Sequence, residues 1–233
     1  MLAMKPTYIN ALSSLCDKTN GADIGIVGQL LGEDYRLDNN YMTATLGIGG
    51  QELMKDTLYM KYAFSEAGLY HEAMLTKKVA HLDVKRRKEF VQLILRKMLS
   101  LRNRRITIFG VTYKSRVLDL TRSPAISVCK ALLREGAFLH IYEPSVDEPR
   151  IRQLLGNPEA VDIFDDDPIE GCTGTHAVAF LVPMHQLQFN FQGIFNVMTE
   201  QPGGRYLFMG WHMNVNFDIL RQMGFLVYIS GKP

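Results

Sequence analysis

The chain has 233 residues, of which 47% are hydrophobic and 21% are charged, and its formal net charge is +2. This size and composition allow a large buried core, in one large domain or two small ones, and they exclude a disordered or strongly basic protein. We therefore expect no nucleic-acid partner, and we interpret the basic run KRRK at 85–88 as a solvated helix face.

The cysteines and histidines predict neither a disulfide framework nor a metal site. The three cysteines are far apart and form no C-x-x-C pair, and the six histidines lack the spacing of metal ligands. The N-terminal segment has no basic region followed by a sustained apolar run, and the sequence shows no membrane span. We therefore expect a cytoplasmic protein without a membrane anchor.

Residues 1–103 have the apolar periodicity of helices. Asp23 is placed to cap the second of them, and 33–50 is a loop rich in Asp, Asn and Gly. The helical segment that begins near Tyr70 is long enough to be one helix or two consecutive ones. The predicted helices end at Gly21, cover 24–32, and run over about 51–67 and 70–101.

The pattern changes at Arg105, where short runs rich in β-branched and aromatic residues begin. These predicted strands are RITIFGVTY, AFLHIYEP, VDIF, HAVAFLV, RYLFM and FLVYIS. Helical segments separate most of them, and the acidic run before Pro168 is predicted to cap one such helix. Alternating strands and helices indicate a parallel sheet covered on both faces. The predicted fold class is therefore α/β, with a helical region over 1–103 and a Rossmann-like parallel sheet domain over 104–233.

The first strand lacks the signature of a dinucleotide site. Gly110 follows it alone, and the segment GVTYKSRVLDLTR contains no G-x-G-x-x-G. We therefore do not expect this sheet domain to bind NAD through that motif.

The segment LGIGGQELMKD, Leu46–Asp56, places several glycines directly before a predicted helix. Such glycines let backbone N–H groups approach a ligand closely, although the same residues also fit a simple turn. The side chain that follows them is Glu52, which without a ligand is an acid favoured by the dipole of the helix.

Five ordered blocks of sequence resemble UDP-glucose 6-dehydrogenase, of the UDP-glucose/GDP-mannose dehydrogenase family. The blocks are NALSSLCDKTNGAD, LGIGGQELMKD, ITIFGVTYKS with DLTRSPAI, GAFLHIYEP and THAVAFLV. The resemblance runs from about Thr7 to Lys232 and implies the family's central, dimerisation-type helical region and its C-terminal UDP-binding domain. It does not include the family's N-terminal NAD-binding domain, so we expect this chain alone to bind no NAD, the cofactor of the family.

The resemblance implies an NAD-dependent oxidation of UDP-glucose to UDP-glucuronate, in which a cysteine thiolate traps the intermediate aldehyde. The family motif resembles G-G-S-C-F-Q-K-D, and Glu52 takes the place of its cysteine. A carboxylate attacks an aldehyde poorly, and losing a covalent nucleophile removes orders of magnitude in rate. The family's active-site lysine would lie before Met1. We therefore expect the chain to be catalytically inactive.

The resemblance also assigns roles to other residues, each of which has an ordinary structural explanation as a helix or loop charge. Asp56 corresponds to a proton-relay aspartate, and Glu52 and Asp56 are the candidate catalytic positions. The candidate cofactor-binding residues are Lys55 and Arg122. The candidate substrate-binding residues are Arg36, Tyr41, Gly47, Gly49 and Lys114. Two positions depart from the family: F-D-G-R is replaced by 208–211, FMGW, and a substrate-loop lysine by Thr43.

Three functions remain open from the sequence. The one we favour is a truncated, divergent UDP-glucose 6-dehydrogenase-like protein without activity, which binds a UDP-sugar weakly or pairs with its own copies or with intact UDP-glucose dehydrogenase subunits. The second is a true oxidoreductase, provided that another chain supplies the NAD, lysine and thiol. The third is a purely structural interaction module. Because the family's NAD domain would cover one side of the cleft, we also expect exposed apolar side chains on the first helices, or a partner that covers them.

Overall fold

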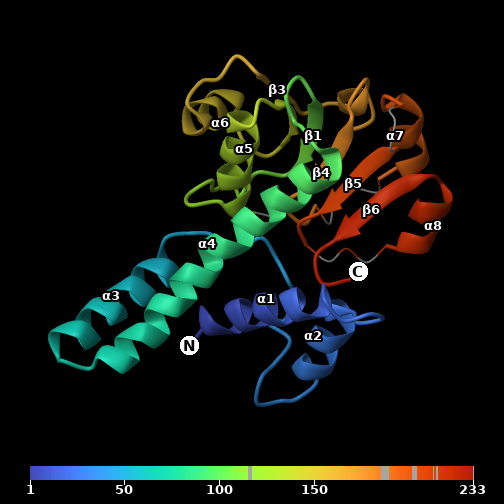
Figure 1. The fold of residues 1–233 in the computed structure, drawn as a ribbon. Coiled ribbons are helices and arrows are strands. Elements are labelled where there is room, and N and C mark those ends of the chain that lie inside the picture. The colour runs from blue at the N-terminus through green and yellow to red at the C-terminus, as the bar shows by residue number, and fades with distance from the viewer. Residues whose placement is uncertain (115–116, 185–188, 201–203, 212, 214, 233) are drawn as a thin grey trace.

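The computed structural model describes residues 1–114, 117–184, 189–200, 204–211, 213 and 215–232 (Figure 1). Its helices are α1 (Met4–Cys16), α2 (Ile24–Gly32), α3 (Glu52–Glu66), α4 (Tyr70–Met98), α5 (Pro124–Arg134), α6 (Glu148–Leu155), α7 (Phe191–Val197) and α8 (Phe217–Gln222), with a 3₁₀ turn η1 (Glu170–Cys172). Its strands are β1 (Arg105–Phe109), β2 (Phe138–Tyr142), β3 (Val161–Phe164), β4 (Ala177–Phe180), β5 (Arg205–Met209) and β6 (Phe225–Ile229).

The six strands form one sheet in the order β3-β2-β1-β4-β5-β6, and every neighbouring pair is parallel. The predicted α/β fold with a parallel sheet is therefore confirmed. Chain order reverses between β1 and β4, which is where open α/β sheets usually leave a crevice at the carboxyl ends of their strands.

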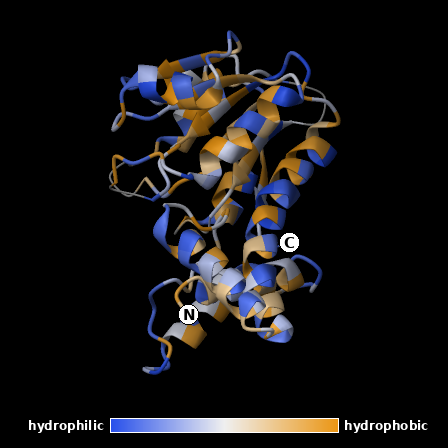
Figure 2. Cartoon of the chain, turned by 90° about the vertical axis from the view of Figure 1, so that its left-hand side faces the viewer, coloured by the Kyte–Doolittle hydropathy of each residue, from blue (hydrophilic) through white to orange (hydrophobic). Residues whose placement is uncertain are grey.

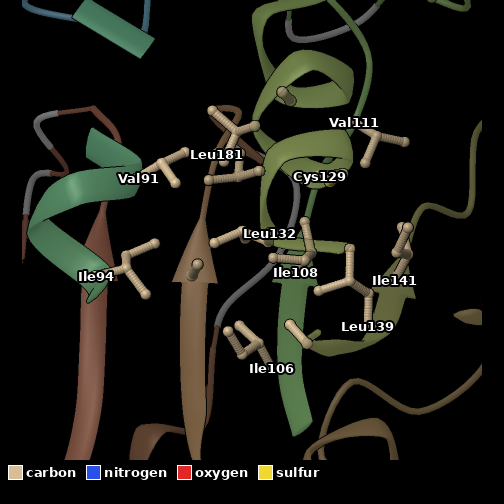
Figure 3. Close-up of a cluster of buried hydrophobic side chains, with 14 of the residues drawn as sticks. Val91, Ile94, Ile106, Ile108, Val111, Cys129, Leu132, Leu139, Ile141 and Leu181 are labelled. Carbon is tan, nitrogen blue, oxygen red and sulfur yellow. The ribbon is translucent and has the colours of Figure 1, made fainter. Parts of the chain in front are cut away.

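Alternating side chains along each strand pack two separate cores. Ile106 and Ile108 of β1 point to the side covered by α5, α6 and the second half of α4, and Figure 3 shows them close to Leu132 of α5, with Ile94 of α4 further along the same core. Phe109 points to the other side, which η1, α7 and α8 cover. A strand that is buried on both faces has a nearly continuous run of apolar residues. The strands could be recognised in the sequence for this reason.

Side-chain caps explain where several helices begin. Asp23 accepts a hydrogen bond from the N–H of Gly25 at 2.8 Å, as predicted, and Ser123 accepts from the N–H groups of Ala125 and Ile126 at the start of α5. The helix predicted after Pro168 is wrong. Only the three residues of η1 form there, because the chain must enter β4 soon afterwards.

The helix α4 is a single helix of 29 residues that belongs to both parts of the molecule. Its first half packs against α3, and the pair projects from the body as a hairpin (Figure 1). Its second half carries Val91 and Ile94 into the core of the sheet domain.

In Figure 2 the strands are mostly hydrophobic, whereas the helices mix hydrophobic and hydrophilic residues. Among the described residues, no helix is both long and apolar enough to cross a membrane.

Candidate functional site

A cleft of about 540 Å³ lies where the helical part meets the sheet domain. One wall is the glycine-rich segment and the first turn of α3, and the other is the loop after β1, with Tyr113, Lys114 and Asp119. We call it the first cleft. Its volume falls in the range of small-molecule sites, and its place between two structural parts is typical of them.

Two polar residues of α4 hold the glycine-rich wall in place. Asp83 accepts a hydrogen bond from the N–H of Ile48 at 2.6 Å and forms an ion pair with Arg87 at 2.8 Å. Arg86 donates from Nε to the carbonyl of Thr45 at 3.1 Å. Asp83 and Arg86 are buried, so the wall is attached to the longest helix rather than free to move.

The glycines are required by close packing and by backbone conformation. Gly47 has φ +139°, and a Cβ there would lie 2.5 Å from Oδ1 of Asp83. A Cβ at Gly49 would lie 2.5 Å from the Cβ of Tyr113, so any side chain would displace that tyrosine from the opposite wall. The N–H of Gly50 donates to the carbonyl of Thr121 at 3.1 Å and joins the two walls.

Glu52 is the first residue of α3 and lines the first cleft. Its side chain is 77% exposed, and one carboxylate oxygen lies 3.4 Å from Nζ of Lys55, one turn further along. An acid in the first turn is stabilised by the helix dipole, and this position would equally stabilise any other anion, including a thiolate.

Among the described residues that line the first cleft, acids outnumber basic residues by two to one. The charged residues among its described lining are Glu52, Asp119 and Lys114. Asp119 accepts hydrogen bonds from the hydroxyl and N–H of Thr121, at 2.6 and 2.9 Å, and these bonds lower the pKa of its carboxyl group. Lys55 and Arg150, outside this lining, lie 3.4 Å from Glu52 and 3.6 Å from Asp119 and partly offset the two acids. The described lining therefore offers one lysine and no surplus of positive charge to a ligand that carries several negative charges.

The structure brings together only some of the residues that the sequence nominated. The first cleft includes Tyr41, Gly47, Gly49, Glu52 and Lys114. The other four do not line it. Arg36 is exposed and paired with Asp34; Lys55 and Asp56 are exposed on α3; and Arg122 is exposed beyond Thr121, at φ +51°.

Sequence reasoning missed Asp83, Arg86, Tyr113 and Asp119 as parts of this site. The sequence does indicate that Asp83 and Arg86 are buried, because they fall between Val79 and Phe90 at the helical spacing of the buried residues of α4. Nothing in the sequence alone places Asp119 opposite the glycines, since that depends on the fold of the loop after β1.

The first two N–H groups after Gly110, in the described part of the loop that follows β1, are already occupied. The buried carboxylate of Glu143 accepts from the N–H of Val111 at 2.9 Å and from that of Thr112 at 3.3 Å. In a dinucleotide site such groups face the pyrophosphate. Within the described residues, no group of three or more His, Cys, Asp and Glu side chains is arranged to hold a metal ion.

Both parts of the chain match models of one protein family. Residues 1–83 match the central domain of the UDP-glucose/GDP-mannose dehydrogenase family, and residues 107–205 match the UDP binding domain of the same family. Together the two matches span most of the chain. The chain therefore belongs to the UDP-glucose/GDP-mannose dehydrogenase family, which confirms the resemblance seen in the sequence.

Individual relatives agree with this assignment. The chain is 32% identical to UDP-glucose 6-dehydrogenase 4 of Arabidopsis thaliana, over 100% of this chain and 51% of the relative. It is 30% identical to UDP-glucose 6-dehydrogenase of Drosophila melanogaster, over 99% and 50%. A solved UDP-glucose dehydrogenase from Pyrobaculum islandicum shares the fold, with a TM-score of 0.79 and 24% identity over 99% of this chain and 48% of that one. The chain spans about half the length of the curated relatives it matches.

Proposed function

We propose that this chain is a divergent member of its family that binds a UDP-sugar weakly in the first cleft and does not oxidise it. The observation that carries the proposal is Glu52. The resemblance puts the family's cysteine at this position, and the structure puts the carboxylate on the cleft wall, in the first turn of α3.

The chemistry of a carboxylate supports inactivity. A thiolate adds to an aldehyde and leaves an adduct that can be oxidised to a thioester, whereas a carboxylate is a poor nucleophile whose acylated product is an unstable anhydride. The charge of Glu52 also opposes the pyrophosphate of a UDP-sugar; Lys55, 3.4 Å away, offsets part of this charge, and Lys114 is the one lysine in the described lining of the cleft. Weak binding without oxidation follows from both effects.

We also propose that the described part of the chain does not bind NAD by itself. The N–H groups of Val111 and Thr112 already donate to Glu143, so a pyrophosphate would have to displace a buried carboxylate. That displacement would leave the carboxylate without its hydrogen bonds, which is costly in a buried position.

The test is to incubate the purified chain with UDP-glucose and NAD while following NADH absorbance, and to titrate UDP-glucose by calorimetry. We expect no NADH above background and weak binding. Glu52→Gln removes the negative charge but no bulk, so it should tighten UDP-glucose binding by about threefold and still produce no NADH. NADH formation by the unaided wild-type chain would overturn the proposal of inactivity.

A second candidate function is an interaction module, or a partner subunit of intact UDP-glucose dehydrogenase. Its support is the hairpin of α3 and α4, because α3 buries none of its residues. The large exposed apolar side chains of the hairpin are Leu58, Tyr59, Met60, Tyr62, Leu69, Tyr70, Met74, Leu75 and Val84. Leu15 of α1 and Leu30 of α2 are exposed as well. Apolar surface of this extent is typical of a protein interface.

Light scattering after size-exclusion chromatography tests this candidate. We expect either a dimer of the chain or co-elution with an intact UDP-glucose dehydrogenase, because water leaves the apolar hairpin on association. The double variant Tyr59→Glu/Met74→Glu should abolish the association. Tyr35→Glu, at a more exposed position outside the hairpin, should leave it unchanged. A wild-type chain that is monomeric and does not co-elute contradicts this candidate.

A further inference from the structure

A second cleft, of about 590 Å³, lies between α1, the middle of α4 and the end of β6. Its walls are formed by residues at 14–18, 86–97 and 227–232, and no described residue lines both it and the first cleft. The buried side chains of Phe90 and Ile229 form part of its walls. Its volume is sufficient for a ligand of nucleotide size.

The charge of the second cleft is opposite to that of the first. Its charged lining residues are Lys18, Arg86, Arg96, Lys97, Lys232, Asp17 and Glu89. Both acids have other partners: Glu89 forms an ion pair with Lys85 at 3.0 Å, and Asp17 accepts from the N–H of Gly231 at 2.6 Å. Lys232 is paired with Asp23 at 2.8 Å. Within the described residues, neither acid forms an ion pair with any of the other four lining cations.

Three cations surround the cleft without a carboxylate partner. Lys18, Arg96 and Lys97 are exposed, and within the described part of the chain none of them lies within ion-pair distance of an acid. Nζ of Lys97 lies 4.6 Å from the ring centroid of Tyr228, a contact that positions the charge without cancelling it.

A fourth cation, Arg86, is buried in the wall. It donates to the carbonyl of Thr45 and, from Nη2, to the hydroxyl of Ser13 at 3.0 Å, and both partners are neutral. Burial lowers the pKa of this guanidinium, while Asp17 and Glu89 oppose the shift from beyond ion-pair distance. A buried charge that has only neutral hydrogen-bond partners is unusual, and an anion beside it would stabilise it.

We propose that the second cleft binds a small molecule bearing one or more phosphate groups. Arg96, Lys97 and Lys18 contact the phosphate at the open side, and Arg86 provides positive charge from the wall. An ordinary solvated helix face does not explain this arrangement, because the cations border one hollow from α4 and from the turn after α1, and one of them is buried.

Calorimetric titration with inorganic pyrophosphate tests the proposal. We expect binding that weakens as salt is raised. The double variant Arg96→Gln/Lys97→Gln should weaken it by about tenfold or more, since each removed cation contributes a charge-assisted contact. Both residues are exposed, so the thermal stability of this variant should match that of the wild type.

Two control variants separate this site from general attraction and from the first cleft. Lys77→Gln/Lys78→Gln removes the same charge from exposed positions of α4 outside the second cleft, and Lys114→Gln removes the lysine of the first cleft. Both should keep the pyrophosphate affinity within about twofold. Equal weakening by the two double variants, loss of binding only in Lys114→Gln, or no binding to the wild type would each overturn the proposal. None of these outcomes depends on whether the chain oxidises UDP-glucose.

Discussion

Replacing Glu52 with cysteine is expected to create one thiol that reacts with a disulfide reagent on the order of a thousand times faster than the native thiols. All three native cysteines are buried, and burial raises the pKa of Cys129 and of Cys172 to about 12. The side chain at position 52 is largely exposed, begins α3 and has Lys55 one turn away, which favours a thiolate. The measurement is the rate of reagent consumption at mildly alkaline pH.

Asp56→Cys is the matched control for this experiment. Asp56 is also exposed on α3, but it lies one turn further along and does not line the first cleft. Its thiol should react at a higher pH than that of Glu52→Cys, because the helix dipole weakens beyond the first residues. UDP-glucose should slow the reaction of Glu52→Cys and leave that of Asp56→Cys unchanged. A thiol at position 52 that reacts as slowly as the native ones would contradict the open first cleft.

Replacing Asp83 with alanine is expected to lower the free energy of unfolding by about 3 kcal/mol. The change removes the partner of a largely buried Arg87 and the acceptor of the N–H of Ile48, and leaves both without a substitute. Urea unfolding measures the loss. Lys85→Ala, on the same helix with an exposed ion pair, should cost well under 1 kcal/mol. Equal losses in the two variants would show that Asp83 does not hold the glycine-rich wall.

Asp83→Asn separates the charge of this residue from its shape, because an amide oxygen can still accept from Ile48. Burial raises the pKa of Asp83, and the contacts with Arg87 and Ile48 oppose the shift without cancelling it. The folded state therefore holds this proton more tightly than the unfolded state, whose carboxyl has a pKa near 4. The stabilising contribution is complete below about pH 4 and is lost as the pH rises through the folded-state pKa. Wild type should thus lose stability relative to Asp83→Asn over that interval, and parallel pH profiles would contradict the assignment.

The elements that could be predicted from the sequence are those with a local cause. The strands were recognisable because both faces of the sheet are buried, and α2 was recognisable because Asp23 caps it. The helix predicted after Pro168 failed for a non-local reason: β4 must start at Ala177 to pair with β1, which leaves little chain for a helix. Tertiary pairing there overrides a capping signal.

The first cleft could be predicted only as far as the family resemblance reached. The resemblance located the glycines, Glu52 and Lys114, which line the same cleft in the structure.

The basic run at 85–88 was interpreted as a solvated helix face, yet Arg86 is buried and donates a hydrogen bond to the carbonyl of Thr45. The charge of Arg86 suggests an exposed side chain, whereas its helical spacing from the other buried residues of α4 predicts a buried one. For Arg86, the helical spacing predicts the burial correctly and the charge does not.

The continuity of α4 restricts how the molecule can recognise ligands. A helix of 29 residues is about 44 Å long, and this one has one end in the hairpin and the other beneath the sheet. A hinge between the two parts would have to bend it, breaking backbone hydrogen bonds that have no other partner. The continuous helix therefore opposes a hinge between the helical part and the sheet domain. We expect selectivity in the first cleft to come from its dimensions and lining rather than from closure of the two parts around a ligand.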